Sequence, residues 1–199
     1  MTFRLFNTLA NTEDESLVFV EDFVDGINMQ SWRIYEGKPV AAHYPENAKI
    51  FLRPENRGAK LTWYVGNTRS MLLVAEGFKN IIESVCAGVE IEYLPVTIHD
   101  QRKRPYGRSY FIVNPIGTFD CLDLQKSDIE WDSDEPKELI RLNEPVLDRK
   151  KTQDAPELFR IKEDSRRYVV GPRLVQAMEQ QAQHFENILW QNLSFGDEL

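Results

Sequence analysis

Leu72-Leu73-Val74-Ala75-Glu76-Gly77-Phe78-Lys79-Asn80-Ile81-Ile82-Glu83 is a segment that recurs later in the chain as Tyr168-Val169-Val170-Gly171-Pro172-Arg173-Leu174-Val175-Gln176-Ala177-Met178-Glu179. Each copy consists of a short apolar run, a break at small residues and a stretch of helical periodicity that ends in Glu. Such a pattern predicts a strand that leads into a helix. The chain therefore contains two predicted strand–helix units, and neither carries the residues of a reaction centre.

The first predicted helix has one continuous apolar face. Phe78, Ile81, Ile82 and Val85 fall at positions i, i+3, i+4 and i+7, which places them on the same side of a helix. Gly88 follows as a stop signal, because glycine readily adopts the conformation that ends a helix.

The second predicted helix begins with Pro172, which suits a first helical turn because its missing N–H would be unpaired there in any case. An apolar–Glu pair follows each helix, Val89-Glu90 after the first and Phe185-Glu186 after the second. The apolar stripe of the second helix is Leu174, Ala177, Met178 and Ala182.

Short strand patterns surround both copies. Turn chemistry at residues 66–67 and 114–117 separates neighbouring runs, so residues 109–113 and 118–124 are expected to pair as a hairpin. Pro95 predicts an edge, a bulge or a break, because proline cannot donate to a ladder of hydrogen bonds. The predicted strands are 32–35, 49–52, 61–65, 89–98, 109–113, 118–124, 139–142, 145–147 and 158–161.

Many short strands with two clear helices predict an α+β fold. The sheet should be mainly antiparallel or mixed, with two principal helices. At 199 residues the chain fits a single domain, residues 1–199. The repeat leaves two interpretations open, either a duplication that gives two pseudo-repeated strand-helix-strand lobes at 1–98 and 99–199, or a chance recurrence of one unit.

The net charge of −8 and the pI near 5.0 disfavour nucleic acid as a direct partner, because phosphate binding requires clustered Lys and Arg. The basic connector Arg102-Lys103-Arg104 with Arg108 also contains Tyr106, so a nucleic-acid contact can be pictured there, but four cations are a small footprint on an acidic chain. Acidity indicates either simple solubility or a basic protein partner.

The cysteines and the N-terminus favour a cytoplasmic location. Cys86 and Cys121 lie in apolar or strand-like contexts, which favour buried free thiols over a disulfide. The first residues turn acidic at Glu13-Asp14-Glu15 and lack the basic start and long apolar core of a signal peptide. No run approaches the roughly 18 apolar residues of a membrane helix, so no membrane partner is expected.

A series of motifs carries a family resemblance over about residues 35–190. In order, they resemble a bacterial family of immunity proteins from polymorphic toxin systems. Where that family usually has Ser at the start of each helix, this chain has Ala75 and Gly171. The motifs are Gly37-Lys38-Pro39-Val40, the segment 72–83, the blocks 89–98 and 110–123, Leu158-Phe159-Arg160-Ile161 and 168–174.

The resemblance implies a cytoplasmic protein that binds and neutralises a cognate toxin domain, with no catalytic residues. The residues themselves agree. His43, His99 and His184 show no metal-ligand spacing, and no nucleophile elbow or phosphate loop is present. A calcium loop counted from Asp128 fails at its sixth and twelfth positions. No catalytic residue, cofactor or metal is expected.

An acidic segment at residues 127–138 is the candidate partner-binding site. It carries six acidic groups and one Lys around a single Trp. Carboxylates would steer a basic partner while Trp supplies desolvated contact area, although such a run is also typical of a solvated loop. The candidate residues are Asp128, Glu130, Trp131, Asp132, Asp134 and Glu135.

The expected function is stoichiometric occlusion of a toxin that acts in the cytoplasm, such as a basic, nuclease-like enzyme. Two alternatives stay open at this stage. One is a small cytoplasmic enzyme with an unrecognised site, and the other is a regulatory module that binds a host-cell protein. The sequence does not specify an oligomeric state.

Overall fold

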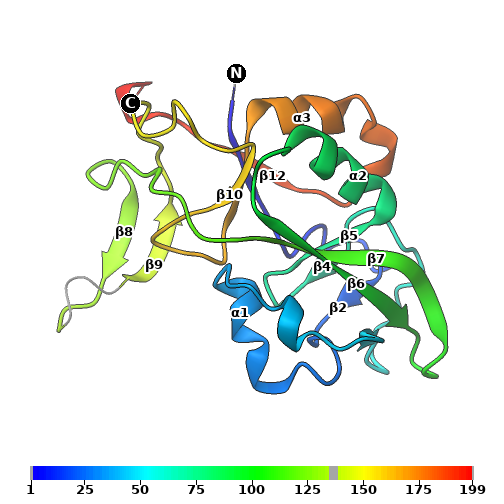
Figure 1. Ribbon diagram of the computed structural model, residues 1–199. Helices are drawn as coiled ribbons and strands as arrows, with labels where there is room; N and C mark the ends of the chain where they lie inside the picture. Colours follow the sequence, from blue (N-terminus) through cyan, green and yellow to red (C-terminus); the bar gives the residue numbers. More distant parts are fainter. Residues whose placement is uncertain (1, 135–138, 199) are drawn as a thin grey trace.

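The two repeated segments each form a strand that leads into a helix. The computed structural model describes residues 2–134 and 139–198, and Figure 1 traces their order. The first copy forms strand β5 (Leu72–Ala75) and helix α2 (Glu76–Val85), and the second forms strand β11 (Tyr168–Val170) and helix α3 (Pro172–Glu179). Both predicted strand–helix units are confirmed.

In the part of the chain that the structure describes, two four-stranded sheets and two pairs of strands accompany these helices, so the α+β prediction is confirmed. The first sheet has the order β3-β6-β7-β5, in which the new strands are β3 (Lys49–Phe51), β6 (Ile91–His99) and β7 (Pro105–Pro115). The second has the order β10-β11-β1-β12, with β1 (Arg4–Phe6), β10 (Leu158–Arg160) and β12 (Trp190–Asn192). The pairs are β2 (Phe19–Val20) with β4 (Gly66–Asn67), and β8 (Asp128–Trp131) with β9 (Leu139–Glu144).

The remaining helical elements are short. Helix α1 spans Trp32–Tyr35, where the sequence pattern predicted a strand, and that prediction is wrong. Alternation over four residues cannot distinguish a strand from one helical turn, and here a 3₁₀ turn leads directly into the helix. The 3₁₀ turns in the described residues are Asn28–Gln30, Ala41–His43, Ala182–His184 and Gly196–Glu198.

The two repeated units share one topology. In the first, β7 lies between β5 and β6 and is antiparallel to both, so β5 and β6 are parallel with one strand between them. In the second, β1 lies in the same way between β11 and β12. Each sheet thus takes one strand from the other half of the chain, and the division into lobes 1–98 and 99–199 stays a prediction.

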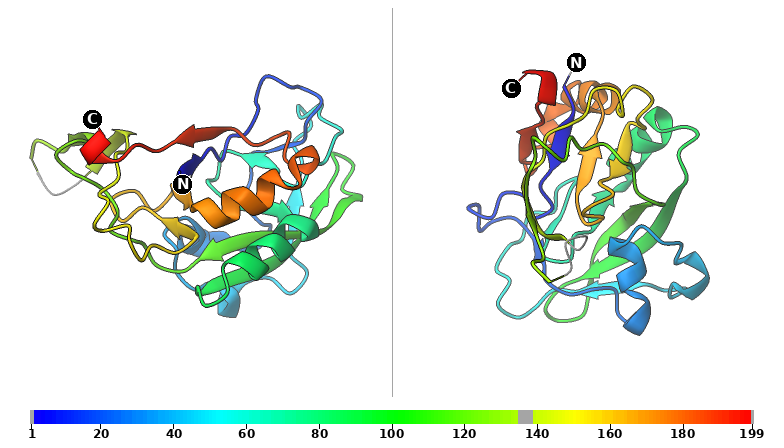
Figure 2. Two further views of the ribbon diagram at one scale, coloured as in Figure 1. Left: turned by 90° about the horizontal axis from the view of Figure 1, so that it is seen from above. Right: turned by 90° about the vertical axis from the view of Figure 1, so that its left-hand side faces the viewer.

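Helices α2 and α3 pack against each other, as Figures 1 and 2 show. Phe78 and Ile82 from α2 lie in the same hydrophobic cluster as Leu174 and Met178 from α3. The two predicted apolar stripes therefore face one common core, which also receives residues from both four-stranded sheets.

The repeated strands are buried on both faces. Leu72 and Val74 of β5 belong to the cluster shared with the helices, whereas Leu73 between them lies in a second cluster. In β11 the middle residue, Val169, lies in a third cluster, apart from its two neighbours. Because both faces are covered, these strands read as continuous apolar runs instead of alternating ones.

Ala75 and Gly171 are the N-cap residues of α2 and α3, and neither has a side chain that caps its helix. At α3 this role falls to Glu157, whose Oε2 accepts hydrogen bonds from the backbone N–H groups of Arg173 (2.9 Å) and Leu174 (3.2 Å). A carboxylate also suits the positive end of the helix dipole. A Cβ on Gly171 would overlap this carboxylate, so the glycine makes room for the distant cap.

Other local predictions are wrong as well, because isolated bridges and pairing with other segments replace the expected strands and turns. Residues 61–65 form no continuous strand, and only Tyr64 makes an isolated bridge, to Val74. The predicted turn at residues 66–67 is strand β4. Residues 118–124 do not pair with β7. Phe119 instead bridges Ile161, and Leu122 bridges Leu147. The turn predicted from residue 114 begins later, since Asn114 and Pro115 still pair within β7.

Pro95 lies inside β6 without breaking it. Thr97, two residues later, donates its N–H to Ala48 O on the β3 side of the strand, so Pro95 turns its nitrogen to the same side. Pairing between β3 and β6 begins only at Thr97, which leaves no ladder bond for Pro95 to lose. Register shifts follow between residues 96 and 99, in agreement with the predicted bulge or edge.

Candidate partner-binding surfaces

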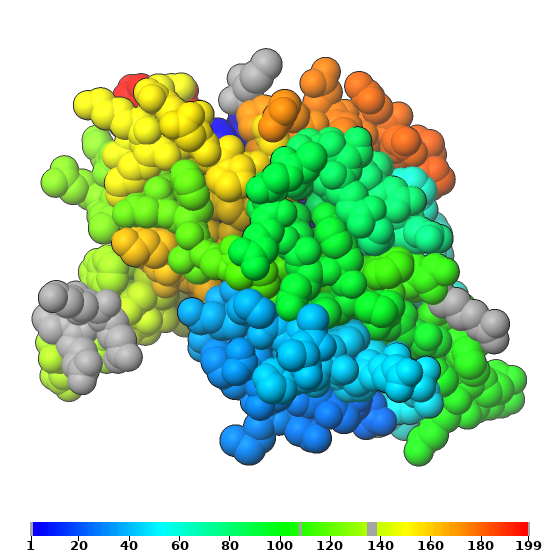
Figure 3. All heavy atoms as spheres, viewed as in Figure 1, coloured from blue at the N-terminus to red at the C-terminus, as the bar shows by residue number. Residues whose placement is uncertain are grey.

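The acidic segment predicted to bind a partner forms a β-hairpin. Asp128, Glu130 and Trp131 lie on β8, whereas Asp132 and Asp134 follow it; Glu135 lies outside the described residues. The prediction of a loop is wrong for residues 128–131, because they pair antiparallel with β9. In the views of Figures 1 and 3 this hairpin lies on the left-hand side of the molecule.

One face of the hairpin is held by the protein and the other faces solvent. Ile129 lies opposite Leu142, and both pack in the third cluster. Glu130 lies opposite Arg141 on the exposed face. Trp131 remains 37% exposed. The hairpin therefore presents an aromatic ring and carboxylates on a strand that is anchored from behind.

The carboxylates of the hairpin differ in their surroundings. Asp128 lies opposite Glu144, a pairing of like charges, and Asp132 accepts a 2.7 Å hydrogen bond from the backbone N–H of Asp134. Within the described part of the chain, Asp128, Glu130 and Asp134 have no ion-pair partner. These carboxylates are thus available to a basic partner.

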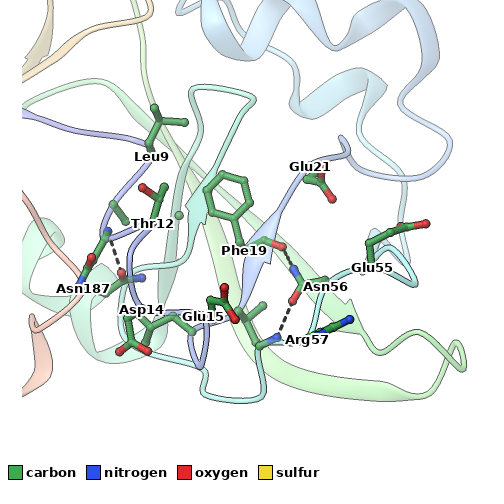
Figure 4. Close-up of a pocket in the computed structure, with 16 residues that line it drawn as sticks. Leu9, Thr12, Asp14, Glu15, Phe19, Glu21, Glu55, Asn56, Arg57 and Asn187 are labelled. Atoms are coloured by element: carbon green, nitrogen blue, oxygen red, sulfur yellow. Dashed lines mark hydrogen bonds between the residues drawn. The ribbon is translucent and has the colours of Figure 1, made fainter.

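A second acidic surface is formed by a cavity of about 500 Å³ between residues 9–21 and 55–58. Figure 4 shows the ring of Phe19 at its centre, with Thr12 on one side and Glu55 on the other. Its carboxylates are Asp14, Glu15, Glu21 and Glu55, and Arg57 also lines it. The sequence indicated an acidic N-terminal region, but not that residue 55 folds back beside it.

Hydrogen bonds fix the walls of this cavity. Asn56 donates its side-chain amide to Phe19 O and accepts a 3.0 Å hydrogen bond from Gly58 N. On the other wall, Asn187 Oδ1 accepts a 3.2 Å hydrogen bond from Asn11 N. A Cβ on Gly58 would overlap the carbonyl of Leu17, so glycine permits the close approach of the two segments.

The carboxylates of the cavity differ in their partners. The Ser16 hydroxyl donates a 2.6 Å hydrogen bond to Asp14 and lowers the pKa of that carboxyl. Glu21 lies 3.4 Å from Arg53. Glu15 and Glu55 have no ion-pair partner among the residues that the structure describes.

The cysteines are unsuited to nucleophilic chemistry. Cys86 and Cys121 are free and buried, as the sequence predicts. Burial raises the pKa of each thiol to about 12. Because the thiolate is the reactive form, neither side chain is activated at neutral pH.

Two of the three histidines pack against aromatic rings, whereas His43 is exposed. The ring of His99 lies 5.2 Å from that of Phe51, and the ring of His184 stacks on Trp63 at 4.0 Å. In residues 2–134 and 139–198, no three His, Cys, Asp or Glu side chains converge as metal ligands. Among the described helices, none has the length and apolar character needed to cross a membrane.

The comparisons with known proteins agree with the motifs in the sequence. The model of the immunity protein family Imm11 matches residues 13–195, which extends beyond the predicted core of 35–190 at both ends. No curated protein matches the chain. Because the family match covers most of the chain, the protein belongs to the Imm11 immunity protein family.

Proposed function

We propose that this protein neutralises a cognate toxin domain by binding it stoichiometrically and covering its active site or substrate surface, with residues 1–199 acting as one immunity-type domain. The observation that carries the proposal is the family match across residues 13–195, since an immunity family implies a toxin partner. The unpaired carboxylates of the hairpin and the cavity support a partner with a basic surface, such as a nuclease. Two free buried thiols suit a reducing compartment such as the cytoplasm.

The β8–β9 hairpin is the proposed contact surface. Binding energy at interfaces concentrates on a few aromatic and charged residues, and carboxylates around them speed the encounter with a basic partner. Trp131 and the exposed Asp128 and Glu130 provide this combination on a strand whose other face is buried. An anchored strand loses little conformational entropy on binding, which favours affinity.

The test is co-expression with a candidate toxin domain taken from the gene next to the one that encodes this protein. Growth should be restored in a bacterial host, and the purified pair should elute as a complex of defined stoichiometry. A titration of toxin activity in vitro sharpens the result: occlusion predicts that inhibition ends at one equivalent of this protein. Inhibition by far less than one equivalent would instead indicate catalysis, and the absence of both rescue and complex would refute the proposed function.

A further inference from the structure

One edge of the sheet β10-β11-β1-β12 is open among the residues that the structure describes. Strand β12 is the last strand in this order, and it pairs with β1 on one side. The left-hand view of Figure 2 shows β12, in dark red, on the outer side of the sheet. An unpaired strand edge offers its backbone groups to another chain, so proteins usually cover such edges.

The other edges of the two four-stranded sheets are covered in this way, which sets β12 apart. In each case a neighbouring segment donates a backbone N–H to the edge strand. The donors and acceptors are Phe119 to Arg160 O of β10 (2.8 Å), Val65 to Leu73 O of β5 (2.9 Å) and Asp25 to Lys49 O of β3 (2.7 Å).

The ladder between β1 and β12 decides which backbone groups point outward. Leu193 donates its N–H to Phe3 O (3.0 Å), and Asn7 donates to Leu189 O (3.3 Å). Hydrogen-bonded and non-bonded pairs alternate along an antiparallel ladder. Gln191, midway between the two bonded positions, therefore also turns its N–H and C=O toward β1.

The N–H and C=O groups of Trp190 and Asn192 consequently point away from β1. Among the described residues, none forms a backbone hydrogen bond with these four groups. The open stretch is bounded at both ends. On one side the N–H of Leu147 reaches Ser194 O (2.9 Å), and on the other the chain turns at residues 185–188.

The segment around this edge is uncharged. Residues 187–195 contain no charged residue and no proline, although charged residues make up 28% of the chain and its net charge is −8. Charged side chains and proline are common means of protecting an edge against pairing. Two copies of an acidic protein repel each other over most of their surface, and a neutral edge avoids this repulsion.

We propose that β12 pairs with β12 of a second copy in an antiparallel, two-fold symmetric dimer. The outward groups of Trp190 and Asn192 lie symmetrically about Gln191, so the two-fold axis passes beside Gln191. Trp190 of each copy exchanges both backbone hydrogen bonds with Asn192 of the other, and the two four-stranded sheets join into one.

The edge suits a second copy because it is self-complementary. A two-fold axis brings the same patch of both subunits together. Gln191 then lies opposite its own equivalent, and a side-chain amide both donates and accepts hydrogen bonds. The exposed Gln191 can therefore pair with itself across the axis. The inference does not depend on toxin neutralisation.

Sedimentation equilibrium measures the self-association of the purified chain. The average mass should rise from 23.2 kDa towards twice that value as the protein concentration approaches about 1 mM, a range in which weak contacts are detected. A wild-type protein that stays monomeric over the whole range overturns the inference. The proposed function would be unaffected, since it is tested by rescue and complex formation with the toxin.

Substitutions at Gln191 test the register. Gln191→Lys and Gln191→Glu should each weaken the dimer about fivefold, because like charges then lie directly opposite each other. An equimolar mixture of the two variants should associate at least as tightly as the wild type. Gln183→Lys, at an exposed glutamine outside the edge, should leave association unchanged. A mixture that fails to restore association contradicts the two-fold pairing.

Asn192→Pro tests the backbone groups. It removes an N–H that points away from β1, so thermal unfolding should change little while the dimer is lost. If this variant fails to fold, hydrogen exchange in the wild-type protein decides. The amides of Trp190 and Asn192 should exchange more slowly at high protein concentration than at low. Protection that appears only when a toxin domain is added would assign the edge to the toxin and overturn the inference.

Discussion

The guanidinium of Arg160 donates a 3.0 Å hydrogen bond from Nη2 to Oδ1 of Asn114, and both side chains are fully buried. Asn114 in turn donates from Nδ2 to Glu92 (3.0 Å), whose carboxylate also accepts the backbone N–H groups of Val40 and Ala41. The side-chain amide of Asn114 thus links the buried guanidinium of Arg160 to the carboxylate of Glu92. Its oxygen accepts one hydrogen bond and its nitrogen donates the other.

This network joins segments that are distant in sequence. Arg160 lies on β10, and its ring neighbour is Tyr168, with the guanidinium carbon 4.3 Å from the ring centre. A buried charge is tolerated only when its donors are satisfied, and here neutral oxygens satisfy them. The remaining acceptors are the carbonyl oxygens of Ile34 (2.6 Å), Ser165 (2.7 Å), Pro115 (3.0 Å) and Tyr35 (3.3 Å).

Arg160→Met should destabilise the fold by roughly 3–5 kcal/mol, because it leaves a set of buried acceptors without donors. Urea unfolding followed by tryptophan fluorescence measures this change. Arg166→Met is the control, since Arg166 is exposed and should cost little. A loss below about 1 kcal/mol in the Arg160 variant would show that the network contributes no appreciable stability.

The cap on α3 predicts a coupling between Glu157 and Gly171. Glu157→Ala should cost roughly 1–2 kcal/mol, because two N–H groups of the first turn lose their acceptor. Gly171→Ala should also destabilise, since its Cβ overlaps the carboxylate of Glu157. In a double-mutant cycle the second change should cost less once Glu157 is absent. Strictly additive effects would contradict the proposed clash and cap.

The ion pair between Asp22 and Arg53 predicts a pH dependence of stability. Arg53 donates hydrogen bonds of 2.8 and 2.7 Å to this carboxylate and lowers its pKa below the ordinary value of 3.8. The folded-state pKa is depressed, so the pair stabilises the fold above pH 3.8, and this contribution disappears as the pH falls through the folded-state pKa.

Asp22→Asn should therefore lower stability slightly at neutral pH and leave it unchanged at the acidic end of the series. The effect is small because both side chains are more than two-fifths exposed. Denaturant unfolding over a pH series measures it, with the exposed Asp25→Asn as the control. A difference from wild type that is the same at every pH would contradict the argument.

If the hairpin is the contact surface, Trp131 should contribute to toxin binding and Trp32 should not. Trp131→Ala should weaken the complex by about tenfold or more, as expected for an aromatic anchor. Trp32→Ala is a close control, because Trp32 is 36% exposed against 37% for Trp131 but lies on α1. Surface plasmon resonance gives both affinities. Equal losses, or none in Trp131→Ala, would place the contact surface elsewhere.

The charges of the hairpin should act mainly on the rate of association. Asp128→Asn with Glu130→Gln should lower the association rate and its dependence on salt, while changing dissociation less. Glu76→Gln with Glu90→Gln removes the same charge from residues outside the hairpin and serves as the control. An unchanged association rate in the hairpin variant would show that these carboxylates do not steer the partner.

Local sequence determined the helices and strands whose apolar residues recur in a regular pattern. The stripe of Phe78 and Ile82 predicted α2, and the apolar runs before the small-residue breaks predicted β5 and β11, because helix and strand periods are read within a few residues. The motifs also predicted the family. Trp32–Tyr35 was misread because four residues do not distinguish the two periods.

Tertiary structure alone decided what depends on contacts between distant segments. The sequence did not indicate that Glu157 would cap α3 or that Arg160 would be buried against Asn114. Each of these relationships pairs polar groups far apart in the chain, and only burial makes such pairing obligatory. The strand–helix units follow from local patterns, whereas the polar contacts between them follow from the way the chain closes on itself.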